Sequence, residues 1–277
     1  MPYFQTKLRD WIDPANISSS FLSLNPNAVE FLKENPDLID WEYLSENPNA
    51  ISLLEENIYL INWNNLSENP NAIDLLMANP KKINWFRLSG NPNAIELLKA
   101  NPDKINWHIL SDNPNAMELL MANENKIYWG MIEENVNAIS YLEANQNKII
   151  WEILSINRNA IHLIKQNLDK INWFILSENS NAISILLENK EKINWKSFSK
   201  NSNPSAIEIL KENQDKIDWY SFAENPAIFT YDYDLIKSNF KDLGEEIIMK
   251  ALHPKRLLKL MELYGEDDIY RCYFDEE

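Results

Sequence analysis

The chain has 277 residues, 45% of them apolar and 11% aromatic, a composition that supplies a sizeable core and excludes intrinsic disorder. Its formal net charge of −16 argues against a broad phosphate-binding surface, because affinity for nucleic acid comes mainly from Lys and Arg. The single cysteine, Cys272, excludes a disulfide framework, and four glycines leave no phosphate-cradling loop. No apolar run is long enough for a membrane span, and the first ten residues lack the apolar core of a secretion signal. We therefore expect a protein that is neither secreted nor in a membrane.

One sequence unit recurs along most of the chain. It reads N-P-N-A-I-x-L-L-x-x-N-x-x-K-I-N-W-x-x-L-S-x over 22 residues, and we number its positions 1 to 22 from the first Asn. Tryptophan holds position 17 from Trp41 to Trp195 at this step, and Trp219 follows 24 residues later because of a two-residue insertion. Nine near-complete units cover residues 25–224. We expect residues 1–24 to form an N-terminal cap and residues 225–277 a C-terminal helical cap or module.

Each unit carries the signals that begin and end two short helices. In the unit that starts at Asn91, this residue is a good N-cap and Pro92 suits the first helical position. Asn101 suits the left-handed residue that ends a helix, which predicts a first helix of about nine residues. Asn106 predicts the cap of a second short helix, from Trp107 to about Asp112.

Helices this short are marginal alone and need neighbours stacked on both sides. The sequence therefore predicts an all-α solenoid of about nine two-helix repeats, a rod or arc roughly 80–90 Å long at usual helix spacing. A leucine-rich repeat is the alternative, since it also allows 22 residues. His108 stands where that repeat needs its second leucine, which favours the two-helix solenoid.

After residue 224 the pattern changes. Residues 225–229 start like another unit, and helical patterns follow at 235–240, at 245–252 and after His253, where Pro254 takes the first turn and Gly265 ends the helix. The final residues are strongly acidic. We expect this segment to cover the last repeat with a polar face, and the alternative is a docking module for one partner.

The N-P-N-A repeats, followed by NPAIFTYDYDLIKSNFKDL and HPKRLLKLMELYGEDD, resemble a family of repeat proteins abundant in giant nucleocytoplasmic DNA viruses. The resemblance covers nearly the whole chain, and residues 225–233 with 253–256 are its most specific part. It implies a viral protein in the host cytoplasm or in virus particles, and it carries no catalytic residues.

The recurring polar residues have structural explanations. Position 3 keeps Asn even where the preceding Pro is replaced, so we expect its side chain to bond the backbone of a neighbouring repeat. We expect the tryptophans to belong to the core. Lysine recurs at position 14, and such a row is compatible with RNA or another polyanion. Acidic residues precede several of these lysines, so a solvated, mutually screened surface is the favoured interpretation.

Nothing in the sequence predicts an enzyme. His108, His162 and His253 lie in different repeats and modules, and neither zinc spacing nor a Ser/His/Asp order emerges. We therefore expect no catalytic, cofactor or metal site. The favoured function is a non-enzymatic, extended surface for protein–protein interaction with a host or viral partner. The alternatives are a structural component of a virus particle and RNA binding along the lysine row.

Positions 18 and 19 of the second helix point away from the core if Trp at 17 and Leu at 20 face it. Several of these residues are aromatic or apolar, and such side chains are enriched in interface cores. Alternatively, some of them fill gaps between repeats. The candidate partner-binding residues are Tyr43, Phe86, Arg87, His108, Ile109, Met131, Phe174 and Tyr220.

Overall fold

The computed structural model describes residues 6–233, 235–238 and 253–264. It divides into two compact units, one of residues 8–230 and one of residues 1–7 with 231–277. Two short strands, β1 (Thr6–Leu8) and β2 (Phe229–Tyr231), pair with each other. The repeats all lie in the unit of residues 8–230.

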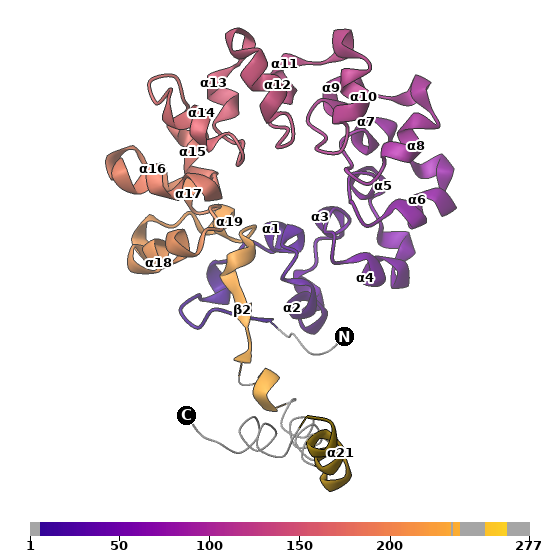
Figure 1. Cartoon of the computed structure of the whole chain (residues 1–277), viewed down its shortest axis with the longest axis vertical. Coiled ribbons are helices and arrows are strands. Elements are labelled where there is room, and N and C mark those ends of the chain that lie inside the picture. The colour runs from indigo at the N-terminus through magenta and orange to yellow at the C-terminus, as the bar shows by residue number, and fades with distance from the viewer. Residues whose placement is uncertain (1–5, 234, 239–252, 265–277) are drawn as a thin grey trace. The chain divides into compact units, whose positions relative to one another are not determined.

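The predicted all-α solenoid of two-helix repeats is confirmed (Figure 1). The first helices are α2 (Val29–Glu34), α4 (Ile51–Glu56), α6 (Ile73–Ala78), α8 (Ile95–Lys99), α10 (Met117–Met121), α12 (Ile139–Ala144), α14 (Ile161–Lys165), α16 (Ile183–Glu188) and α18 (Pro204–Glu212). The second helices are α1 (Ser19–Leu24), α3 (Trp41–Leu44), α5 (Trp63–Leu66), α7 (Trp85–Leu88), α9 (Trp107–Leu110), α11 (Trp129–Ile132), α13 (Trp151–Leu154), α15 (Trp173–Glu178), α17 (Trp195–Phe198) and α19 (Trp219–Phe222). In most repeats a 3-10 turn joins the first helix to the second, such as η5 (Pro102–Lys104).

The first helix begins later than its sequence predicts. Helix α8 starts at Ile95 and has only five residues, because Asn91 caps the preceding turn: its Oδ1 accepts a 2.9 Å hydrogen bond from the backbone N of Asn93. Asn101 is not left-handed, with φ of −134°. Instead its Nδ2 donates to the Leu97 carbonyl at 2.9 Å, so the side chain itself caps the end of the helix.

The two-residue insertion restores the predicted cap in one repeat. Helix α18 has nine residues, with Pro204 in its first turn and Asn203 as N-cap, whose Oδ1 accepts from Ser205 N at 2.9 Å. The extra residues separate this cap from Asn201, which remains buried between repeats. The nine-residue first helix that the sequence predicts for every repeat therefore forms only in the repeat that has the insertion.

A column of asparagines joins the repeats. The Nδ2 of Asn91 donates to the carbonyls of Ser67, at 3.1 Å, and Asn69, at 2.8 Å, in the preceding repeat. Asn93, at position 3, donates to the Pro70 carbonyl at 2.8 Å, which confirms the prediction for that position. Buried carbonyls between the layers thereby gain donors. The buried column consists of Asn25, Asn47, Asn69, Asn91, Asn113, Asn135, Asn157, Asn179, Asn201 and Asn225.

This column closes on itself. Asn25 donates through Nδ2 to the carbonyls of Ala223, at 3.1 Å, and Asn225, at 2.9 Å, so the first repeat uses the last one as its preceding neighbour. Asn27 makes the matching bond to the Pro226 carbonyl at 2.9 Å. The repeats therefore form a closed ring (Figure 1), and the prediction of an open rod or arc is wrong.

Residues just outside the array complete the closure. The Trp11 and Phe222 rings stack with centroids 5.8 Å apart, and Arg9 N donates to the Ile228 carbonyl at 3.0 Å. Arg9 Nε also donates to Ala227 at 2.7 Å. Residues 8–24 and 225–230, expected to cover two separate ends, thus pack at a single junction where the ends of the array meet.

The core is built from the small and branched residues of each unit. Leu98, Leu110 and Ala94 are fully buried, as are their counterparts in the other repeats. The tryptophans pack against this core but are only half-buried. The lysine of the next repeat lies over each ring from Trp63 to Trp195; Lys126 Nζ, for example, is 4.1 Å from the Trp107 ring centroid.

In the second unit, α21 (Pro254–Tyr264) forms where the sequence predicts a helix after His253. Residues 235–238 are also helical, within the predicted helix at 235–240. The helix predicted at 245–252, the end predicted at Gly265 and Cys272 lie outside the described residues.

Candidate functional site

Where Figure 1 separates them, the second helices lie on the inner side of the ring and the first helices on its outer side. In Figure 1, α3, α5, α17 and α19 lie toward the middle, whereas α4, α6, α8, α16 and α18 lie at the periphery. In most repeats the second helix ends at position 20, and position 22 lies in the turn that follows it. We call the surface formed by the second helices and these turns the second-helix face; the predicted partner-binding residues belong to it, at positions 18 and 19.

The predicted residues separate into two groups by position. Those at position 18 are exposed: Phe86 (55%), Phe174 (52%), Tyr220 (56%) and His108. Those at position 19 are half-buried: Tyr43, Arg87, Ile109 and Met131. The expectation that both positions point outward is therefore wrong for position 19.

Position 19 connects neighbouring second helices. Arg87 Nη1 lies 2.8 Å from Glu68 Oε2 of the preceding repeat, forming an ion pair. The Tyr43 ring packs against Phe21, with centroids 5.6 Å apart. A four-residue helix turns only a little more than once, so its flank at position 19 faces the next repeat. The alternative interpretation of these residues, as fillers between repeats, holds at this position.

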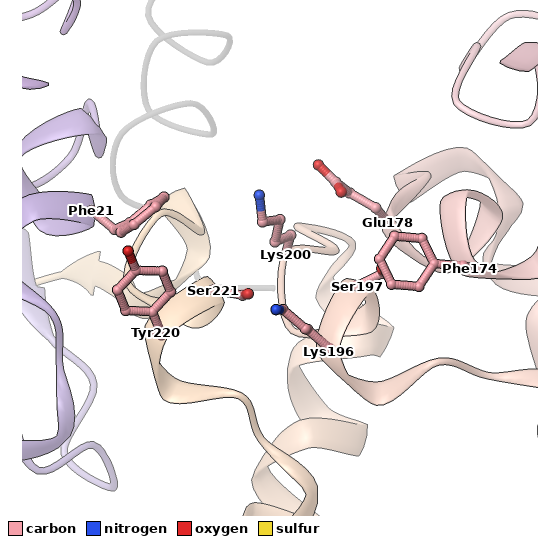
Figure 2. A pocket seen from close by; sticks show the side chains of 8 residues that line it. All are labelled: Phe21, Phe174, Glu178, Lys196, Ser197, Lys200, Tyr220 and Ser221. Atoms are coloured by element: carbon pink, nitrogen blue, oxygen red, sulfur yellow. The ribbon is translucent and has the colours of Figure 1, made fainter.

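Two of the exposed aromatics line a pocket of about 250 Å³ (Figure 2). Phe174 lies at one end, and Tyr220 lies at the other beside Phe21, with ring centroids 4.3 Å apart. Lys196 and Lys200 lie between these ends. The small Ser197 occupies position 19 here. We call this the aromatic pocket; it depends on ring closure because Phe21 precedes the first repeat.

A second cavity, of about 370 Å³, shares Glu178 and Lys200 with the aromatic pocket. Residues from both ends of the array line it, including Glu46 and Glu224, and we call it the closure cavity. Lys200 Nζ is 3.0 Å from Glu224 Oε2. Like the aromatic pocket, this cavity exists only in the closed ring.

The carboxylates of the closure cavity belong to an acidic row at position 22 that the sequence-based prediction missed. Comparing position 22 across the units reveals this row. Its members are Glu46, Glu68, Asp112, Glu134, Glu178 and Glu224. Closure brings the ends of this row together as well.

Burial and mutual repulsion perturb this row. Burial, together with the negative charges of Glu134 and Glu68, raises the pKa of Asp112 to about 6. Burial also raises the pKa of Glu46 and of Glu134, each with a neighbouring carboxylate adding to the effect. Both burial and like charge disfavour the ionised form of these carboxyl groups. The raised pKa values therefore indicate that neighbouring cations do not fully neutralise the acidic row.

Glu133 replaces the serine found at position 21 of most units. In the unit before it, Ser111 Oγ donates to the Trp107 carbonyl at 2.8 Å and accepts from Tyr128 N at 2.9 Å, linking two repeats. Glu133 Oε1 accepts from Ile150 N at 3.0 Å, but its buried Oε2 has no hydrogen-bond partner among the described residues. Burial raises the pKa of this carboxyl group.

The lysine row at position 14 has a packing role. Its ammonium groups lie between 4.1 and 5.9 Å from the tryptophan centroids of the preceding repeat, within reach of cation–π attraction. The members of the row are Lys82, Lys104, Lys126, Lys148, Lys170, Lys192 and Lys216. These lysines cover the exposed faces of the tryptophan side chains, and this role explains why one recurs in each of these repeats without invoking a nucleic-acid ligand.

Among the described residues, no group of three or more His, Cys, Asp or Glu side chains is arranged to hold a metal ion. None of the helices in the same residues combines the length and the apolar character that crossing a bilayer requires. Comparisons of the chain with models of protein families, with curated proteins and with solved structures gave no match. The resemblance to viral repeat proteins therefore stays a prediction.

Proposed function

We propose that the protein is a non-enzymatic repeat protein that binds a protein partner on the second-helix face of its ring. The observation that carries the proposal is the exposure of Phe86, Phe174 and Tyr220 at position 18, each more than half accessible. Exposed aromatic side chains of this kind supply much of the affinity of protein interfaces.

The fold does not need aromatic residues at these sites. Position 18 is Glu42, Asn64 and Glu152 in other repeats, whose second helices pack in the same way. Exposing three large aromatic side chains therefore does not stabilise the closed array of repeats. Binding of a partner explains their presence, and the aromatic pocket offers a concave site for an apolar side chain of that partner.

The test is a double variant, Phe86→Asn/Phe174→Asn, which gives both repeats the residue that Asn64 supplies at position 18 of another repeat. We expect the variant to lose the partner that the wild-type chain retains in affinity capture, while its unfolding temperature stays within about 2 °C because exposed substitutions change stability little. The matched control, Glu96→Ala/Glu118→Ala, alters exposed residues of the first helices and should retain the partner. Unchanged capture by the Asn variant would refute the proposed surface.

A further inference from the structure

A second apolar surface lies on the turns of the first three repeats. Three successive 3-10 turns, η2 (Pro36–Leu38), η3 (Ile58–Leu60) and η4 (Pro80–Lys82), occupy the same place in their units. Within them Leu38 is 36% exposed, Ile58 47%, Tyr59 80% and Leu60 37%. Tyr59 has the largest exposed fraction of the large apolar side chains that the structure describes. We call η2, η3 and η4 the three-turn face.

Packing of the ring does not explain these residues. In the turn η5 the same three positions are Pro102, Asp103 and Lys104, which suit a solvated surface and let the lysine cover a tryptophan. The η3 turn departs from that pattern at all three positions, and it exposes apolar area that burial would stabilise. A surface of this kind indicates a protein contact.

The charges beside Tyr59 identify the partner. Asp37 and Lys81 hold position 13 in the repeats before and after it, and both are exposed. A two-fold axis through Tyr59 therefore places Asp37 of one copy opposite Lys81 of the other. The same symmetry places Lys81 of the first copy opposite Asp37 of the second, so the dimer has two such pairs.

We propose that the three-turn face is self-complementary and that two copies of the chain pair through it in a two-fold dimer. Tyr59 and its neighbours Ile58 and Leu60 form the apolar centre, and the Asp37–Lys81 pairs lie on either side. The face is small, so we expect a reversible dimer with a dissociation constant of roughly micromolar order rather than a permanent one. The contact is independent of the second-helix face, which remains available to a partner.

The first experiment is sedimentation velocity of the full chain from about 1 to 300 µM, a range that brackets the micromolar affinity expected of a small interface. We expect a monomer–dimer equilibrium in the wild-type chain. The triple variant Ile58→Pro/Tyr59→Asp/Leu60→Lys copies the η5 turn and should be monomeric throughout, with an unchanged or higher unfolding temperature. The control Phe86→Asn removes an exposed aromatic elsewhere and should dimerise like the wild type. A monomeric wild type, or a triple variant that still dimerises, overturns the proposal.

The second experiment tests the two-fold arrangement. Lys81→Glu alone and Asp37→Lys alone each place like charges opposite one another and should weaken the dimer about tenfold or more. The double variant Asp37→Lys/Lys81→Glu restores opposite charges in a two-fold dimer and should recover the wild-type constant within about threefold. If it stays as weak as the single variants, these residues do not face each other and the proposed pairing is wrong.

Discussion

Asn25 and Asn225 are 200 residues apart in the chain, yet the Nδ2 of Asn25 donates a 2.9 Å hydrogen bond to the backbone oxygen of Asn225. The same bond joins every pair of consecutive repeats, such as Asn113 to Asn91 at 2.9 Å. The junction between the ends of the array is therefore chemically equivalent to the junctions inside it. The ring has no open layer for a separate cap to cover.

This equivalence predicts that Asn25→Asp destabilises the protein as strongly as Asn113→Asp. Aspartate keeps the Oδ1 that accepts from the backbone two residues later, but it loses the Nδ2 donor and sets a buried carboxylate against two carbonyls. We expect each variant to lower the free energy of unfolding by about 2–4 kcal/mol. Thermal and urea unfolding measure both. In an open array Asn25 would lack its partners, and its substitution would be nearly neutral.

A second prediction concerns the tryptophans. Trp107→Ala removes a ring that packs against the core and supports Lys126, and we expect a loss of about 3 kcal/mol of stability. Lys126→Met keeps the apolar stem and removes the charge, so it should cost only about 0.5–1 kcal/mol. Glu96→Ala, on the outer side, should change stability by less than about 0.5 kcal/mol. Equal effects of the three substitutions in denaturant unfolding would contradict this description of the packing.

The third prediction is a dependence on pH. The pKa of Asp112 rises from 3.8 to about 6 on folding, so between these values the folded state holds a proton that the unfolded state has lost. Its contribution to stability therefore falls as the pH rises through this window and is constant above it. Asp112→Asn should stabilise the protein by roughly 1–2 kcal/mol at pH 7.5 and by almost nothing at pH 4.

The control for Asp112 is Asp103→Asn, an exposed change in the same repeat. Its effect on the unfolding temperature should be small and the same at both pH values. An equal effect of Asp112→Asn at the two pH values would show that burial and the neighbouring carboxylates do not raise the pKa of this group.

The fourth prediction concerns Glu133. Glu133→Ser restores the hydroxyl that accepts from the next repeat elsewhere in the ring and removes a buried oxygen without a partner. We expect stability to rise by about 1 kcal/mol at neutral pH, since an unsatisfied buried group is costly. The reciprocal change, Ser111→Glu, should destabilise the ring. If both variants unfold at the wild-type temperature, the serine at position 21 has no role in joining the repeats.

The local elements of the ring could be predicted from the sequence because they depend on neighbours along the chain. The 22-residue period predicts two helices per unit and the leucines of the core, and Pro254 after His253 predicts the start of the helix outside the array. Position 3 was identified because Asn persisted there when Pro did not, and Asn93 does bond the adjacent repeat. Where one side chain could serve either of two structural roles, the sequence did not show which role it takes. Asn91 suits a helix cap, but its amide is used between repeats and the helix starts four residues later.

The candidate site was predictable only in part. Phe86 and Phe174 were expected at the surface and are exposed, whereas Ile109 and Arg87 were expected there and lie between helices. The direction of a side chain on a four-residue helix depends on the adjacent repeat, which a helical projection does not include.

Closure itself was decided only by the tertiary structure. Each repeat is rotated slightly relative to the one before it, and this small angle follows from packing across the interface rather than from any single residue. Summed over the ten layers marked by the buried asparagines, the rotation completes one turn and brings Trp11 against Phe222. A slightly different angle with the same period would have left the array open. The aromatic pocket and the closure cavity are both lined by residues from the two ends of the array, so both depend on this total rotation.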